Sequence, residues 1–243
     1  MPENVSHGNG GNDRRPIASY WHTLGFVLIS IVPVVYGMAM QKGAAGTPAI
    51  EPATPERLKF YLISIGSDWL LFYFCWVGVH WKGGDFFQLA GGRWNSAKDA
   101  LKDIGIALPF WVVWELAARG GHWILGPDQA KPVQPLLPRS FLEVAVWLAV
   151  CVTAGFCEEM IFRGYLQRQF LAMSGSVGVA IVAQAFFFGI GHAYQGWKQV
   201  CIIVVLGVLY GVLAAWRRNL QANILAHVWS DLWEGWLKFL LVR

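Results

Sequence analysis

The sequence has little charge for its length. Of 243 residues, 19 are Lys or Arg and 15 are Asp or Glu, so charged residues make up 14%, where a soluble domain carries about 25%. Hydrophobic residues make up 56%, with 14 tryptophans. A soluble domain of this size leaves roughly a quarter to a third of its unfolded surface in water and could not bury so large an apolar share. The composition therefore disfavours a soluble globular enzyme and excludes disorder beyond the first residues.

Other features are also missing. The basic residues form no patch, which argues against nucleic-acid binding. Apolar and polar residues do not alternate strictly, so a membrane β-barrel is not expected. The cysteines contain no CxxC pair, so neither a metal-ligand spacing nor a disulfide framework is indicated. We expect all four to be small buried apolar residues: Cys75, Cys151, Cys157 and Cys201.

Long apolar runs dominate the chain and predict an all-α, polytopic transmembrane bundle of about seven helices. The first run, 20–40, is about 20 residues long, which is enough to cross a bilayer once. A cleaved signal peptide is the alternative for this run, although it is long for that role. The runs are 20–40, 59–81, 104–118, 141–157, 177–191, 200–216 and 224–241.

The chain is expected to form one domain, because no internal repeat is present. Residues 1–19 are predicted to be a flexible polar tail, and 20–138 to be N-terminal transmembrane helices and loops. Residues 139–243 are predicted to be a helical core that forms one domain with the preceding helices. Loops rich in Gly and Pro are expected at 43–55 and 119–138.

Four acidic residues lie in or beside the apolar runs without an obvious partner: Asp68, Asp103, Glu115 and Glu143. A charge at membrane depth costs roughly 2.5 kcal/mol or more, so it needs a partner or a function. Asp103 and Glu143 lie near predicted helix starts, where a carboxylate is stabilised by the helix dipole. For Asp68 and Glu115, hydrogen bonding between helices is the simplest role, and their function stays open.

The segment F-C-E-E-M-I-F-R contains two adjacent carboxylates, Glu158 and Glu159. On a helix, adjacent side chains point about 100° apart, so the two cannot share one role. Glu159 precedes Arg163 by four residues, the favoured order for a helical ion pair. Glu158 then has no local cation, and a desolvated carboxylate of this kind can act as a general base. The alternative is a pair of interfacial charges.

Two later segments carry imidazoles. His192 closes the apolar run F-F-F-G-I-G-H, in which Gly189 and Gly191 would permit close helix contact. His227 and Asp231 are four residues apart and share one helical face. The acid could hold the imidazole in one tautomer, or the pair could bind a water or a metal ion. Either histidine alone could also be a satisfied core residue.

Together, these segments predict a polar, water-holding site, because three consecutive hydrophobic segments each contribute an acid or an imidazole. No side chain is placed as a strong nucleophile, so the natural chemistry is water activation. Glu158 would take the proton with help from His192, and His227 with its neighbour would stabilise a tetrahedral oxyanion. A zinc version would use Glu158, His192 and His227 as ligands, but an H-E-x-x-H spacing is absent.

Three motifs in this order resemble the CPBP family, which comprises type II CAAX prenyl endopeptidases and bacteriocin-processing or immunity proteins. They are E-E-x-x-x-R at 158–163, F-x-x-x-H at 188–192 and H-x-x-x-D at 227–231. The resemblance covers residues 140–235 and implies an all-helical intramembrane endopeptidase. By this resemblance, Glu158 and His192 activate water, His227 and Asp231 lie at the oxyanion, and Glu159 and Arg163 are supporting. An ionised Asp231 cannot donate to an oxyanion, so it must be protonated, orient His227 or bind a cation.

The resulting prediction is hydrolysis of a peptide bond in a membrane-embedded or membrane-proximal protein or peptide, without a cofactor; zinc is the alternative. The bilayer and the substrate are the expected partners, with no nucleic acid. The bacterial cytoplasmic membrane is the expected location. A non-catalytic immunity or scaffold protein, or a transporter that uses the polar cluster as a relay, would be the competing functions.

Overall fold

A computed structural model describes residues 15–44, 54–126 and 136–237, and this part of the chain is helical and contains no strand. The 34 residues Phe141–Ser174 form one uninterrupted helix, so the described chain has seven long helices, and the predicted all-α bundle is confirmed. The α-helices are α1 (Tyr20–Ala44), α2 (Thr54–Trp81), α3 (Ala97–Leu125), α4 (Phe141–Glu158), α5 (Gln167–Ser174), α6 (Val177–Gly191), α7 (Trp197–Arg217) and α8 (Gln221–Leu232). Two π-helical segments (Glu159–Leu166 and Trp233–Leu237) and two short 3₁₀ turns (Phe86–Ala90 and Ala193–Gln195) complete the described elements.

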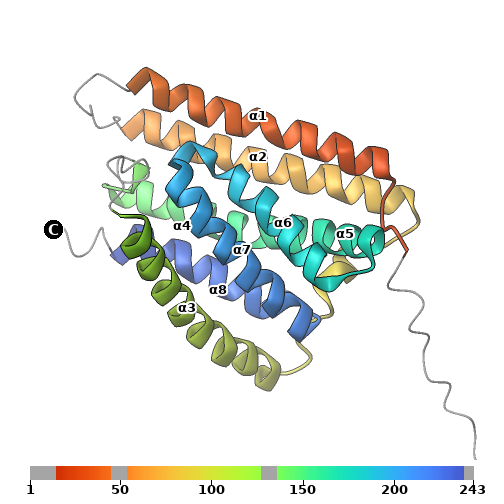
Figure 1. Ribbon diagram of the computed structural model, residues 1–243. Helices are drawn as coiled ribbons and strands as arrows, with labels where there is room; N and C mark the ends of the chain where they lie inside the picture. Colours follow the sequence, from red (N-terminus) through yellow and green to blue (C-terminus); the bar gives the residue numbers. More distant parts are fainter. Residues whose placement is uncertain (1–14, 45–53, 127–135, 238–243) are drawn as a thin grey trace, which may run out of the picture.

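The C-terminal end of α4 is buried by neighbouring helices, whereas its first turn, with Phe141 and Leu142, is exposed. Helices α1 and α2 lie side by side along one edge, and α3 lies along the opposite edge (Figure 1). Helix α4 packs against α2 and α8, while α7 packs against α6 and α3. The C-terminal end of α4 and the π-helical segment after it therefore meet α2, α6 and α8 at one place.

Three helices are long and apolar enough to cross a membrane: α2, Phe141–Ser174 and α7. Shorter apolar stretches are present at Tyr20–Val35 and in α6. Large apolar side chains on α2 and α7, such as Leu62, Leu70 and Val205, are exposed on the outside of the bundle. Exposed apolar surface of this extent matches lipid, in which apolar side chains do not need to be covered by protein.

The start of α4 agrees with its sequence signal. Ser140 accepts a hydrogen bond from the backbone N–H of Glu143, and the Glu143 carboxylate accepts one from the backbone N–H of Ser140, which is a complete capping box. Glu143 is fully buried and also forms an ion pair with Arg57 at 2.8 Å. The predicted placement of Glu143 at a helix start is correct, and the ion pair adds a link between α4 and α2.

Helix α3 is longer than the predicted run 104–118. It begins after Ser96, whose side chain accepts from the backbone N–H of Asp99, and it continues through two glycines that had been assigned to a loop. The start seven residues earlier removes Asp103 from the first turn, so its predicted interaction with the helix dipole is wrong. Asp103 is instead buried and forms an ion pair with Arg217 at 2.6 Å.

Other differences are local. The run predicted to end at 157 continues as a helix to Ser174. Cys75, Cys151 and Cys157 are buried as expected, but Cys201 is exposed on α7, so the expectation is wrong for that residue. Most of the predicted tail 1–19, part of the loops at 43–55 and 119–138, and the end of the run 224–241 lie outside the described residues.

Gly155 sets how closely α4 approaches α8, and its replacement is a test of this packing. A Cβ at position 155 would lie 2.5 Å from Val228 Cγ2 and 3.0 Å from its backbone nitrogen. We expect Gly155→Ala to destabilise the fold by about 1–3 kcal/mol, because an overpacked helix contact must open. Thermal unfolding in detergent measures this change. Gly105→Ala on α3 is the control, since its Cβ would meet nothing within 4 Å; an equal loss there would contradict the packing argument.

Candidate active site

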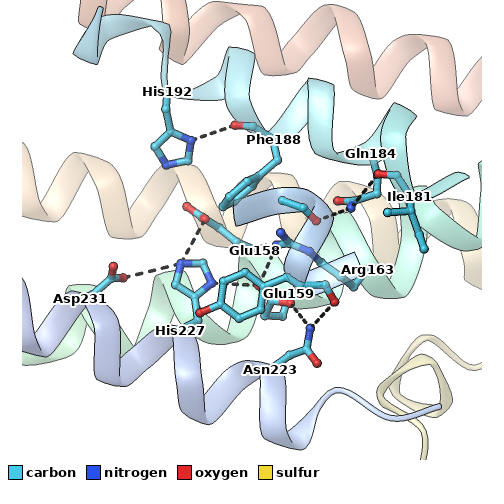
Figure 2. Close-up of polar contacts among 12 residues, drawn as sticks. Glu158, Glu159, Arg163, Ile181, Gln184, Phe188, His192, Asn223, His227 and Asp231 are labelled. Carbon is cyan, nitrogen blue, oxygen red and sulfur yellow. Dashed lines mark hydrogen bonds and ion pairs between the residues drawn. The ribbon is translucent and has the colours of Figure 1, made fainter. Parts of the chain in front are cut away.

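Glu159 is the centre of a buried polar cluster. Its side chain is fully buried, and Oε1 accepts from Arg163 Nη1 at 2.7 Å. The same oxygen lies 2.9 Å from His227 Nδ1, and Oε2 accepts from Asn223 Nδ2 at 3.1 Å. The predicted ion pair with Arg163 is therefore present, but Glu159 also connects the π-helical segment to α8 through two further hydrogen bonds (Figure 2).

Arg163 is held by one carboxylate and two aromatic rings. Its guanidinium carbon lies 4.3 Å from the centre of the Phe188 ring and 4.9 Å from that of the Tyr210 ring. Its Nε and Nη2 are buried and have no hydrogen-bond partner within the described residues. In such a dry environment, the ring faces and the Glu159 carboxylate together stabilise the cation.

The tautomer of His227 is set by Glu159. A carboxylate can only accept a hydrogen bond, so Nδ1 of His227 carries the proton that it donates to Glu159. The other nitrogen, Nε2, is thereby directed at two carboxylates, Glu158 Oε2 at 3.7 Å and Asp231 Oδ2 at 3.8 Å. Asp231 is too distant for a hydrogen bond to His227. The tautomer-fixing role that the sequence offered to Asp231 thus belongs to Glu159.

Glu158 points away from its neighbour, as the helix geometry predicts. Its side chain is 17% exposed, yet Oε2 is buried and accepts no hydrogen bond from the described residues. Its ion-pair partner among the described residues is His227 Nε2, at 3.7 Å and so beyond hydrogen-bond distance. Glu158 therefore presents a carboxylate oxygen whose lone pairs are not used by any described residue.

His192 ends α6 with its ring directed toward Glu158 (Figure 2). Nδ1 lies 2.9 Å from the carbonyl oxygen of Phe188, to which it donates, and this leaves Nε2 as the nitrogen with a free lone pair. Gly189 allows the close helix contact predicted for it, because a Cβ there would lie 2.4 Å from Val204 Cγ2 on α7. Gly191 does not, since a Cβ there would meet nothing within 4 Å.

Two further residues near this site were not assigned to it from the sequence. Asp68 on α2 interacts electrostatically with Glu158, His227 and Asp231. Tyr194, two residues after His192, stacks on its ring at 6.2 Å and interacts with Glu158 and Asp231. Burial and these carboxylates raise the pKa of Tyr194 to about 12, so its hydroxyl stays protonated at neutral pH and can donate. The proximity of Tyr194 to His192 in the sequence is the signal that could have found it.

The cluster does not have the form of a metal centre. Among residues 15–44, 54–126 and 136–237, no group of three or more His, Cys, Asp or Glu side chains is arranged to hold a metal ion. Zinc bound by Glu158, His192 and His227 would need three ligand atoms at about 2.0–2.2 Å from one point. The hydrogen bonds to Phe188 and to Glu159 engage Nδ1 of each histidine and leave Nε2, as they would in a metal ligand. The described side chains nevertheless form no group of three that could hold the ion.

Residues 140–233 match the family model described as type II CAAX prenyl endopeptidase, Rce1-like. This segment contains every residue of the cluster on α4, α6 and α8 and coincides with the region of the predicted resemblance, which is confirmed. No curated protein and no solved structure matches the chain. The matched family is a family of membrane proteases, and with three helices able to cross a bilayer the chain is an integral membrane protein.

Proposed function

We propose that the chain is an intramembrane endopeptidase that hydrolyses a peptide bond of a membrane-embedded or membrane-proximal substrate with water activated by Glu158 and His192. The observation that carries the proposal is the unpartnered buried oxygen of Glu158 beside an imidazole of fixed orientation. Burying a hydrogen-bond acceptor without a partner lowers the stability of a protein. Such unpaired groups are rare, and a catalytic role is one of the reasons for which they occur. The family match supports peptidase activity in general.

In this mechanism Glu158 removes a proton from water as the water oxygen attacks the peptide carbonyl carbon. His192 uses its free Nε2 to orient the same water. The carbonyl oxygen becomes an oxyanion, which the protonated Nε2 of His227 stabilises with its N–H. Glu158 then returns the proton to the nitrogen as the carbon–nitrogen bond breaks, so the products are a carboxylate and a free amine.

Each supporting residue has a separate role in this scheme. Glu159 holds Nδ1 of His227, so the imidazole can offer only Nε2 to the substrate. Arg163 balances the charge of Glu159, and Asn223 holds its second oxygen. Asp231, with 35% of its side chain exposed, adds negative charge beside Nε2 and favours the protonated imidazole.

The substrate would be a peptide segment in or beside the bilayer, and the membrane would be the bacterial cytoplasmic membrane. The site is formed by α4, α6 and α8, and two of these elements belong to strongly apolar segments. A peptide bond that reaches the site must leave water, which favours a membrane substrate over a soluble protein.

The test is cleavage of single-span membrane peptides by the purified protein in lipid vesicles, read by mass spectrometry of both products. We expect one defined cleavage position and a rate that is unchanged by a strong chelator. Loss of cleavage with chelator and recovery with zinc would instead favour the zinc-dependent reaction and contradict the metal-free mechanism. Absence of cleavage over a broad peptide panel, with the protein folded, would favour the immunity or scaffold function.

The transporter alternative predicts a different distribution of polar residues along the chain. Proton-coupled transporters place discontinuous helices in both halves of the chain, whereas the polar cluster lies mainly on α4, α6 and α8. Uptake of a solute by vesicles that contain the protein would overturn the protease proposal. We expect no uptake above that of empty vesicles.

Replacement of Tyr194 by Phe tests whether its hydroxyl acts at the site. The hydroxyl accepts from Gln195 Nε2 at 3.0 Å and keeps its proton, so in the proposed reaction it can donate to the oxyanion; a hydrogen bond to a charged group is worth about 1.5–3 kcal/mol. We expect kcat to fall roughly 10–100-fold with an unchanged unfolding temperature. Tyr73→Phe on the exposed side of α2 is the control. Unchanged kcat in the Tyr194 variant would remove this residue from the site.

A further inference from the structure

A polar pocket of about 200 Å³ lies at the end of the bundle where α7 turns into α8. It lies between this turn, the connection that precedes α3, and the first turns of α3. Its lining includes three cations and three amides, and none of the lining residues belongs to the candidate active site. The lining residues used below are Arg93, Trp94, Lys102, Arg217, Asn219 and Gln221.

Three buried polar atoms around this pocket have no hydrogen-bond partner within the described chain. They are Arg217 Nε, Asn219 Oδ1 and Gln221 Oε1. The orientation of Gln221 is fixed, because its amide nitrogen donates to the carbonyl oxygen of Gly92. Buried polar groups are nearly always paired, so one donor and two acceptors left around one cavity indicate a ligand with complementary groups.

The charges around the pocket are unbalanced in favour of cations. Asp103 is already satisfied, since Oδ1 accepts from Arg217 Nη2 at 2.6 Å and Oδ2 from Trp94 Nε1 at 2.8 Å. Asp99 accepts from the backbone of Asn95 and the side chain of Ser96. Arg93 and Lys102 are exposed, and neither forms a hydrogen bond or an ion pair within the described chain. The lining therefore offers an anion two uncommitted cations.

The pocket lies at the boundary of the membrane. Helix α7 can cross a bilayer and ends at Arg217, and α2 can also cross it and ends at Trp81. The two ends lie on the same side, because Leu220 N donates to the carbonyl oxygen of Ala90 at 2.9 Å. Trp81 and Trp216 are 79% and 68% exposed, as is typical of indoles at the headgroup level.

We propose that this pocket binds the headgroup of an anionic phospholipid that carries a phosphate and two hydroxyl groups, as in phosphatidylglycerol. The phosphate takes Arg93, Lys102 and the Nε–H of Arg217. The two hydroxyls donate to Asn219 Oδ1 and Gln221 Oε1, which account for the remaining unpartnered atoms. The acyl chains then lie along the outside of the bundle beside the exposed Trp216. This site is independent of the proposed protease activity.

The test is native mass spectrometry of the whole protein, released from detergent with defined lipids. We expect one phosphatidylglycerol molecule to remain bound and phosphatidylcholine to be lost. Phosphatidic acid has the phosphate without the two hydroxyls, so its retention should be about tenfold weaker. The Arg93→Gln, Lys102→Gln double variant should retain phosphatidylglycerol at least about tenfold less than the wild type.

Lys98→Gln is the matched control, because Lys98 is an exposed cation one turn before Lys102 on the same helix and does not line the pocket. An equal loss of lipid in this variant, or equal retention of phosphatidylcholine, would overturn the proposal. Competition with inorganic phosphate distinguishes a lipid headgroup from free phosphate as the bound anion. Displacement of the lipid by millimolar phosphate would identify a free-phosphate site and overturn the lipid assignment, whereas we expect no displacement.

Discussion

Replacing Glu158 by Gln abolishes cleavage while the protein remains folded. Gln has nearly the same shape, but its amide cannot take a proton from water at neutral pH. A positioned general base contributes about 10²–10⁴-fold to a rate, so we expect kcat to fall at least about 1,000-fold. Oε2 of Glu158 has no hydrogen-bond partner among the described residues, so the unfolding temperature should change little. Single-turnover cleavage in vesicles and thermal unfolding in detergent measure the two effects.

Glu56→Gln is the matched control for this variant, because Glu56 is an exposed carboxylate in the first turn of α2. It should cleave at the wild-type rate. A Glu158→Gln variant that retains more than about a tenth of the wild-type rate would remove Glu158 as the base, since that is less than a general base contributes. The chain could then still be a peptidase, but its general base would be another residue.

Replacing the adjacent Glu159 by Gln should destabilise the whole bundle. Arg163 would remain fully buried without a counter-charge, and removing one partner of a buried ion pair typically costs 3–5 kcal/mol, of which we expect about 3. Cleavage should also slow, because His227 loses the carboxylate that fixes its tautomer. Thermal or denaturant unfolding in detergent measures the loss. Glu158→Gln should thus lower the cleavage rate alone, whereas Glu159→Gln should lower the stability as well.

The double variant Glu159→Gln, Arg163→Met separates charge burial from catalysis. Met fills much of the volume of Arg without a charge, and such replacements of buried ion pairs are often neutral or stabilising. We expect the double variant to recover most of the lost stability but not the cleavage rate. A Glu159→Gln single variant as stable as the wild type would contradict the account of the buried cluster.

Much of the fold could be predicted from the sequence, because a membrane-spanning helix needs about 20 consecutive apolar residues and such runs are visible in the sequence. Long apolar runs gave the seven helices within a few residues in most cases, and the capping box marked the start of α4. The sequence places the C-terminal end of α3 too early, because Gly120 and Gly121 favour a loop; Gly121 instead lies against Ile202 of α7, where a Cβ would be only 2.9 Å from that side chain. Tertiary packing outweighs the weak helix propensity of glycine at such a contact.

Only part of the candidate site could be predicted from the sequence. Spacing of four residues predicted the Glu159–Arg163 pair, because it depends on one helix alone. The hydrogen bond from His227 to Glu159 joins residues 68 positions apart, and nothing local indicates it. The same holds for the rings that cover Arg163 and for Asp68 on α2. The π-helical segment Glu159–Leu166 was also not predicted, although π-helical turns are frequent at functional sites.

The most direct measurement is an experimental structure of the Glu158→Gln variant with an uncleaved substrate peptide bound in a bilayer mimic. We predict a water molecule within about 3 Å of both side chain 158 and His192, facing the carbonyl carbon of the scissile bond. The carbonyl oxygen should lie within about 3 Å of His227 Nε2. A peptide seated elsewhere, or a scissile carbonyl that faces away from both imidazoles, would contradict the account.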